Sequence, residues 1–89
     1  VVFANSPNPF NPSTTVRFTL GQPGKVSLTI YDVLGRTVRK LADGDLESGA
    51  HDLSFDGHDD RGQSLASGIY LARLSGIGQT KTLKMVLLR

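Results

Sequence analysis

The amino-acid sequence predicts an all-β fold, an immunoglobulin-like antiparallel β-sandwich of about seven strands. Apolar residues recur with a period of two along several short runs, and no stretch has a convincing helical period. Turn-forming residues separate the runs at intervals of about 8–12 residues, which is the strand spacing of a sandwich. Because the chain contains neither cysteine nor tryptophan, it lacks the Cys–Trp–Cys signature of an antibody-type domain.

The alternating runs each present one apolar face, which suits antiparallel strands with one side on a core and the other in water. His51 falls on an inward position and Tyr31 on an outward one. Tyr70 and Leu71 point to opposite faces, and the alternation leaves open which of them is inward. The predicted core residues are Val16, Phe18, Leu20, Val26, Leu28, Ile30, Leu53, Phe55, Tyr70 or Leu71, Leu83 and Met85.

The connections between the runs carry turn chemistry. In "QPGK" (22–25), Pro23 and Gly24 occupy the positions that a type II turn prefers. In "DVLGR" (32–36), Asp32 can close an Asx turn and Gly35 can take the left-handed conformation of a three-residue hairpin. The segment "SGIGQ" (75–79) predicts a third glycine-containing turn. The longer loops 42–49 and 56–62 are predicted to cross between the two sheets.

The N-terminal segment "NSPNPFNPSTT" contains three prolines, which hold their own torsions and favour extended backbone in the residues before them. It fits an edge segment of the first strand with Phe10 as its anchor. It also fits a semi-rigid spacer that holds the domain off a preceding module. We therefore divide the chain into a proline-rich linker or edge segment, 1–13, and an immunoglobulin-like domain, 14–89.

Length and charge narrow the function classes. Eighty-nine residues suffice for one domain with one core, and the net charge of +2 comes from interspersed basic and acidic residues. No apolar run is long enough to span a bilayer, so no membrane insertion is expected. The opening "VVFA" is too short for a signal-peptide core, and the chain lacks an initiator methionine. We expect a piece of a longer protein that ends at the parent's C-terminus.

The acidic segment "FDGHDDRG" (55–62) is where a metal would sit, with Asp56, Asp59 and Asp60 as weak candidate ligands for calcium. The calcium-loop pattern fails, because its glycine position is Arg61 and its final glutamate position is Ser67. The alternative is a turn-rich loop whose aspartates accept hydrogen bonds from nearby backbone N–H groups. We predict no essential metal and no cofactor.

Catalytic and nucleic-acid-binding patterns are missing. His58 lies in a loop, yet no G-x-S-x-G motif offers it a serine partner, and no catalytic residues are assigned. The basic residues are spread over several strands, without the exposed aromatics beside a basic groove that bind single strands. The case for carbohydrate binding is weak, because the chain has no tryptophan and only Tyr31 among its aromatic residues falls clearly on an outward position. The sequence thus predicts a non-enzymatic module that does not bind nucleic acid.

Three blocks and the final segment resemble a known family. They are "SPNPFNPSTTVRFTL", "KVSLTIYDVLGRTVRKL", "GAHDLSFDGHDDRGQSLASGIYLARL" and "KTLKMVLLR". Their order and spacing are similar to the type A C-terminal sorting domain of type IX secretion substrates. The middle block is also similar to the immunoglobulin-like domain of the flagellar hook-capping protein. Phe55 stands where the family commonly has tryptophan, and tyrosine in the "SGIYLARL" motif favours Tyr70 as the inward residue.

The resemblance implies a sorting and anchoring module of an exported protein, secreted or held at the cell surface after passing the periplasm and outer membrane. Its partners would be the outer-membrane secretion machinery and an N-terminal parent module, such as a hydrolase, and the domain itself would be a monomer. The resemblance places the signal in the last strand, at Lys81, Lys84, Met85, Val86, Leu88 and Arg89. The alternatives are an accessory or spacer module with weak carbohydrate binding, and a hook-cap-type domain.

Overall fold

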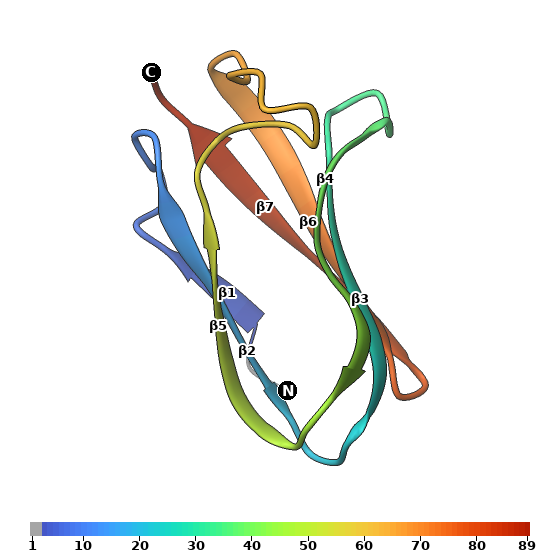
Figure 1. The fold of residues 1–89 in the computed structure, drawn as a ribbon. Coiled ribbons are helices and arrows are strands. Elements are labelled where there is room, and N and C mark those ends of the chain that lie inside the picture. Colours follow the sequence, from blue (N-terminus) through green and yellow to red (C-terminus); the bar gives the residue numbers. More distant parts are fainter. Residues whose placement is uncertain (1–2) are drawn as a thin grey trace.

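The computed structural model describes residues 3–89; Val1 and Val2 lie outside the described residues, so the segment 1–13 is described from Phe3 onwards. Within this range, two antiparallel sheets form a sandwich without a helix, which confirms the predicted fold class (Figure 1). The described part of the chain accordingly has no helix long and apolar enough to cross a membrane. The strands are β1 (Phe3–Ser6), β2 (Thr14–Leu20), β3 (Gly24–Tyr31), β4 (Thr37–Leu46), β5 (Gly49–Phe55), β6 (Gly68–Gly76) and β7 (Gln79–Leu87).

One sheet has the strand order β1-β2-β5 and the other the order β4-β3-β6-β7. In immunoglobulin notation these are A-B-E and C′-C-F-G. β1 and β7 are edge strands of different sheets, and they contact each other on the same side of the sandwich. The β6–β7 ladder runs without a register shift from Gly68–Leu87 to Gly76–Gln79. The last strand is therefore a long, regular edge.

The core fills the space between the inner faces of the two sheets. The predicted core residues are buried, except that Leu53 and Leu83 are partly buried and pack against the others. Tyr70 is the inward member of its pair, with 7% of its surface exposed. The anchor Phe10 is 1% exposed. Four further apolar residues are buried and absent from the list of predicted core residues, and these are Phe10, Ala72, Leu74 and Leu87.

Three of the predicted connections are confirmed. Asp32 Oδ1 accepts hydrogen bonds from the backbone N–H groups of Leu34 (2.9 Å) and Arg36 (3.0 Å), and Gly35 has φ 82°. The turn between β6 and β7 consists of Ile77 (φ 54°) and Gly78 (φ 71°), the left-handed pair that a tight hairpin requires. The loop that begins at Asp56 does cross from one sheet to the other, because β5 and β6 belong to different sheets.

Two details of the predicted connections are wrong. Gly24 does not have the positive φ of a type II turn; it is the first residue of β3 and pairs with Leu46. A Cβ at Gly24 would lie 3.2 Å from Ile77 Cγ1, so the glycine allows close packing there. The predicted loop 42–49 is mostly strand, since β4 continues to Leu46 through register shifts against β3. Such irregularities absorb residues that break a simple alternation. The predicted crossing between the sheets does occur, in the short connection from β4 to β5.

The N-terminal segment takes part in the sandwich from Phe3 onwards. β1 pairs with β2 from Phe3–Phe18 to Ser6–Thr15. The connection between these strands, residues 7–13, leaves the three-stranded sheet and reaches β7 of the other sheet through a bridge between Phe10 and Leu87. The pairing of β1 supports an edge role for this segment, and the domain boundary after residue 13 stays a prediction.

Candidate functional site along the last strand

Four of the predicted recognition residues lie in β7, and two follow it directly. The Met85 side chain is fully buried and belongs to the core, so a partner cannot contact it while the sandwich is folded. Lys81 and Lys84 are exposed, Val86 is half-buried, and 51% of the Leu88 surface is exposed. The structure therefore separates one buried candidate from a group of side chains at the surface.

The backbone of β7 presents one edge to β6 and the other away from the sheet. Leu83, Met85 and Leu87 pair with Ala72, Tyr70 and Gly68. In an antiparallel ladder, alternate residues direct their N–H and C=O groups to opposite edges. Backbone groups of Lys84, Val86 and Leu88 form hydrogen bonds on the side of β7 that faces away from β6. We call this side of β7 its outer edge.

Residues 7–13, here called the strap, close part of this outer edge. Asn8 Nδ2 donates to the Lys84 carbonyl (3.1 Å), and the Val86 N–H donates to Asn8 Oδ1 (3.0 Å). The Phe10 N–H donates to the Val86 carbonyl (2.9 Å), and the Leu88 N–H donates to the Phe10 carbonyl (2.9 Å). The Asn8 amide thus replaces a strand backbone, and the edge between Lys84 and Leu88 is satisfied within the chain.

The strap is held in place at its centre and at both ends. The Phe10 ring is buried and packs against Phe55, with ring centroids 5.8 Å apart. The Thr14 hydroxyl donates to the Pro7 carbonyl (2.9 Å), and the Asn5 amide donates to the same carbonyl (3.3 Å). These contacts fix the strap by core packing and by polar contacts with the neighbouring strands.

Arg89 is tied to the loop between β5 and β6. Its backbone N–H donates to Ser67 Oγ (2.8 Å), and its Nη2 donates to the Gly57 carbonyl (2.7 Å). Its Nε donates to the Leu65 carbonyl. We call this set of contacts the Arg89 latch. The latch holds Leu88 and Arg89, which follow β7, against the loop between β5 and β6.

Gly57 is the point where the strap, the loop and the latch meet. It has φ 75°, a conformation that side chains with a Cβ rarely adopt. A Cβ at this position would lie 2.9 Å from the Pro12 carbonyl oxygen and 3.0 Å from Arg89 Nη2. Glycine is therefore required at this position both for the turn and for the close approach of two other segments.

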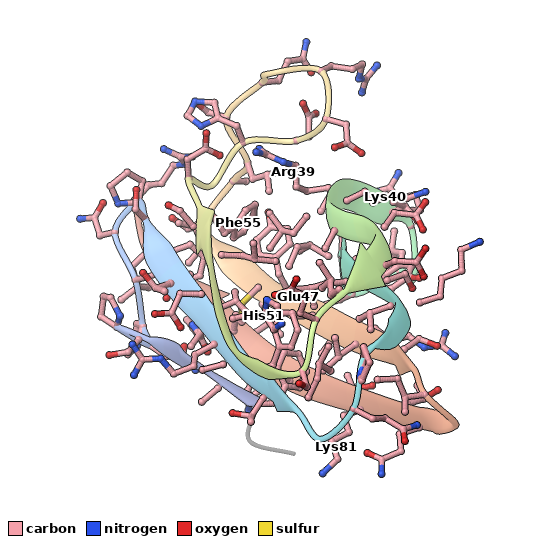
Figure 2. All side chains as sticks on the ribbon, turned by 60° about the horizontal axis from the view of Figure 1, so that its bottom comes forward. Arg39, Lys40, Glu47, His51, Phe55 and Lys81 are labelled. Atoms are coloured by element: carbon pink, nitrogen blue, oxygen red, sulfur yellow. The ribbon has the colours of Figure 1, made fainter. Side chains whose placement is uncertain are left out.

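The acidic loop 56–62 surrounds an arginine. Figure 2 shows Arg39 directed from β4 toward this loop. Its Nη1 donates to Asp56 Oδ1 and to the His58 carbonyl, both at 3.0 Å, and its Nε lies 3.9 Å from Asp60 Oδ1. Burial acts to raise the pKa of Asp56, but the His58 backbone N–H and the Arg39 guanidinium outweigh it and lower that pKa. The guanidinium supplies the positive charge that a metal ion would otherwise bring.

The other two metal candidates also bond within the loop and to β4. Asp59 Oδ1 accepts from the N–H groups of Arg61 and Gln63, both at 2.9 Å. Asp60 Oδ1 accepts from the Lys40 N–H (3.1 Å), and the Asp60 N–H donates to the Val38 carbonyl (2.9 Å). Within residues 3–89 no three His, Asp or Glu side chains are placed to hold a metal ion together. Each of these carboxylates has a structural role in the loop.

The two histidines occupy different environments. His51 stacks on Phe18 with ring centroids 5.2 Å apart, and its Nε2 lies 2.7 Å from the Glu47 carbonyl. His58 Nε2 lies 3.3 Å from Ser64 Oγ, a serine that no sequence motif indicates because the contact depends on the bridge between the two residues. Asp56 Oδ1 is 3.5 Å from His58 Nδ1, but it already accepts from Arg39. The set Asp56, His58 and Ser64 therefore lacks a carboxylate that serves only to orient the His58 imidazole, as a catalytic triad requires.

Exposed apolar side chains gather near the start of β6, and the strand pattern of the sequence does not indicate them. Val33 and Leu34, in the β3–β4 turn, are 67% and 75% exposed, and Ile69 is 43% exposed. These three side chains line a hollow of about 240 Å³. Ile69 pairs with Val86 across the β6–β7 ladder, so this apolar area continues to the last strand. The apolar pair inside a predicted turn was the signal that could have indicated it.

Tyr70 forms a contact that is typical of one class of sandwich. Its hydroxyl donates to the Ala66 carbonyl four residues earlier (2.7 Å), and burial raises its pKa. Tyr70 lies near the start of β6, the strand at the F position, and this is the tyrosine corner found in immunoglobulin-like domains. The fold and this contact define the chain as an immunoglobulin-like domain.

The family follows from the sequence match. The family model of the FlgD Ig-like domain matches residues 9–79, and the chain belongs to this family. The match includes the strap from Pro9 onwards, the acidic loop and the tyrosine corner, and it ends at the first residue of β7. No curated protein matches the chain.

Solved structures with the same fold cover almost the whole chain. Dimeric latent PorU from Porphyromonas gingivalis matches with a TM-score of 0.77 and 23% identity, over 97% of this chain and 9% of that one. PorZ, a surface component of the type IX secretion system of the same organism, matches with a TM-score of 0.68 and 22% identity, over 98% and 11%. The DNA glycosylase AlkC of Pseudomonas fluorescens matches at 0.50 and 16%, over 99% and 29%. At these identities the matches show the fold, and this chain spans about a tenth of PorU or PorZ.

Proposed function

We propose that this chain is a non-catalytic sorting and anchoring module that directs a secreted parent protein across the outer membrane to the cell surface by type IX secretion. The observation that carries the proposal is the likeness to parts of PorU and PorZ over 97% and 98% of this chain, a span that includes β7. PorZ is itself a surface component of that secretion system. The order of the sequence blocks supports the same assignment, and the family match to residues 9–79 supports the immunoglobulin-like fold that it requires.

The geometry supports recognition of the last strand in its folded form. Lys84, Val86 and Leu88 direct their side chains away from the core, whereas Met85 contributes by holding the strand on the sandwich. The strap fixes the backbone of this stretch, and the Arg89 latch fixes the segment after it. A partner would meet a pre-organised surface and would not need to order a flexible tail, which lowers the entropic cost of binding.

The remaining features of the proposal concern the surroundings of the module. The outer-membrane secretion machinery is the proposed partner, and a parent module, such as a hydrolase, precedes this domain in the full-length protein. Residues 14–89 form the sorting domain, and residues 1–13 join it to the parent while contributing β1 and the strap. The module acts as a monomer, without cofactor, nucleic acid or membrane insertion, in a protein that is secreted or held at the cell surface.

A reporter fusion tests the proposal. The chain is fused to the C-terminus of an inert, exported reporter and expressed in a host with the type IX machinery and in an isogenic strain without it. We expect the reporter outside the cell in the first strain and in the periplasm in the second. An unrelated immunoglobulin-like sandwich of similar size, fused in the same way, serves as the control. Retention of the reporter in the periplasm of both strains would refute the proposal.

A hook-cap-type module is the second candidate, because the matching family model is that of the FlgD Ig-like domain. In that case the full-length reading frame should contain a flagellar neighbour domain, and the reporter should remain in the periplasm of both strains.

Carbohydrate binding by an accessory module has one observation in its favour. Tyr31, Leu71 and Arg73 share an outer-face hollow of about 350 Å³ with Thr80 and Thr82. A glycan-array signal that disappears in Tyr31→Ala would support this function over sorting.

A further inference from the structure

The outer edge of β7 is closed over one half and open over the other. The β6–β7 ladder has no register shift, so alternate residues of β7 direct their backbone N–H and C=O groups to the outer edge along its whole length. Thr80 and Thr82 therefore direct these groups to the same edge as Lys84 and Val86 do. Within residues 3–89, the strap satisfies the edge from the Lys84 carbonyl to the Leu88 N–H, and no other strand pairs with the stretch before it. Among residues 3–89, the backbone groups of Thr80 and Thr82 and the Lys84 N–H have no hydrogen-bond partner, so they can pair with a further strand.

The strap itself shows what this edge accepts. Asn8 and Phe10 bind it with backbone-like donors and acceptors, and the Phe10–Leu87 bridge is parallel. Before Asn8 the chain turns away at Pro7 and enters β1 of the other sheet. A second extended segment could therefore continue the edge from Thr80 to Lys84 and end where Asn8 begins. Addition of a strand to an open sheet edge is an established form of peptide recognition.

The charges around the open stretch indicate the chemistry of its partner. Two basic side chains flank the open stretch, Arg73 on β6 and Lys84 on β7, and Arg73 lies opposite Thr82. The adjacent edge strand β1 contains no charged residue. Basic residues on an edge oppose pairing with another basic or neutral strand, whereas a facing carboxylate is favourable. The edge should therefore select an acidic strand.

From this juxtaposition we infer that the outer edge of β7 at Thr80–Lys84 is a docking site for an extended, acidic segment of a partner protein, which adds to the four-stranded sheet. The edges of β4 and β1 are less suitable. Asp60 forms hydrogen bonds with the backbone of Val38 and Lys40 at the edge of β4, and the β3–β4 ladder has register shifts. β1 is four residues long. β7 combines a nine-residue regular ladder with basic side chains.

The test uses the purified chain and two defined peptides. Isotope-labelled protein is titrated with a blocked octapeptide of alternating glutamate and valine, and separately with the matching lysine and valine peptide. We expect amide shifts at Thr80, Thr82 and Lys84 with the acidic peptide, and binding weaker by about tenfold with the basic one. Equal binding of the two peptides, or no shifts at these amides, would overturn the inference.

A pair of variants at one position separates backbone docking from side-chain contact. Thr82→Pro removes an N–H that faces the open edge, and proline is tolerated on edge strands where that group does not serve the ladder. Thr82→Val keeps the N–H and removes the hydroxyl. We expect acidic-peptide binding to persist in Thr82→Val and to be lost in Thr82→Pro, with thermal unfolding confirming that both fold. Persistent binding in a folded Thr82→Pro variant would also overturn the inference.

The inference rests on the proposed function only for the source of the acidic segment, which would be the secretion machinery. The two can fail separately. A reporter that is exported while the peptide titrations are negative would leave the proposed function standing and remove the docking site. A positive titration together with a reporter that stays in the periplasm would leave the docking site standing and remove the proposed function.

Discussion

Asparagine and aspartate side chains replace backbone partners at several points in this sandwich. Their oxygens accept from N–H groups in tight turns, and at two sheet edges they take the place of a neighbouring strand. This use explains why short acidic and amide residues gather in the loops. The residues that act in this way are Asn8, Asp32, Asp59 and Asp60.

The Asp32 carboxylate should make stability depend on pH in the acid range. The Arg36 N–H is the main cause that lowers the pKa of Asp32; the Arg36 guanidinium and the Leu34 N–H add to it and outweigh the effect of burial. Its contribution is therefore complete above its unfolded pKa of about 3.9 and is lost as pH falls through the lower folded value. We expect the melting temperature of Asp32→Asn to fall less between about pH 5 and pH 2 than that of the parent chain. Parallel pH curves for the two proteins would contradict this role.

Gly57 and Gly62 provide a matched test of close packing. Both have positive φ, 75° and 84°, but a Cβ at Gly62 would meet nothing within 4 Å. Gly62→Ala should therefore cost only the torsional penalty, about 1–2 kcal/mol. Gly57→Ala should cost more, because its Cβ would also approach the Pro12 carbonyl and Arg89 Nη2 too closely. Denaturant unfolding of both variants measures the difference, and equal losses would mean that the latch region adjusts without cost.

At the scale of elements, the alternation of apolar residues identified most strands and their inward faces, because that pattern is local. The predicted turn role of Gly24 and the predicted loop in place of the end of β4 were wrong. In both places, pairing between β3 and β4 overrides the local preference for a turn. Local patterns indicated the anchor of the strap, Phe10, but not its contacts with β7. Asn8 bonds to Lys84 and Val86 across sequence separations of 76 and 78 residues, so only the folded topology brings them together.

The strap predicts a difference between two similar asparagines. Asn8 bonds to β7, whereas the described residues give the Asn11 side chain no hydrogen bond, although both precede a proline. Asn8→Ala should speed hydrogen exchange at the Val86 amide and destabilise the sandwich by about 1–3 kcal/mol, the cost of two lost hydrogen bonds. Asn11→Ala should leave both quantities nearly unchanged. Unaltered exchange at Val86 in Asn8→Ala would show that Asn8 does not hold this edge.

At the scale of the whole molecule, the parts that hold the last strand come from the beginning, middle and end of the chain. The strap, the loop at Gly57 and the Arg89 latch meet at one end of the sandwich. The sequence indicated the strand itself by alternation, its recognition role only through a family resemblance, and it did not show that the strap closes part of its outer edge. Presentation of this strand therefore depends on folding of the complete domain.

This dependence allows folding and recognition to be measured separately. Leu83 packs against the core, so Leu83→Asp should unfold the domain and abolish export of a fused reporter together. Lys84→Glu combined with Val86→Ser changes two outward side chains of β7 and leaves the strap's backbone contacts intact. We expect this double variant to melt within a few degrees of the parent, because surface changes usually stay within about 0.5 kcal/mol. We also expect it to reduce the extracellular fraction of the reporter.

Lys25→Glu is the matched control for that double variant. It reverses an exposed charge on β3 of the same sheet, away from the last strand. The new glutamate faces Asp45 across the β3–β4 ladder, so we expect a small fall in melting temperature and no change in export. Melting temperature and extracellular fraction are measured for every variant in the same type IX host. If the folded double variant is exported as well as Lys25→Glu, the secretion machinery does not read these side chains. Recognition would then rest on the backbone edge of β7 or on another face of the sandwich.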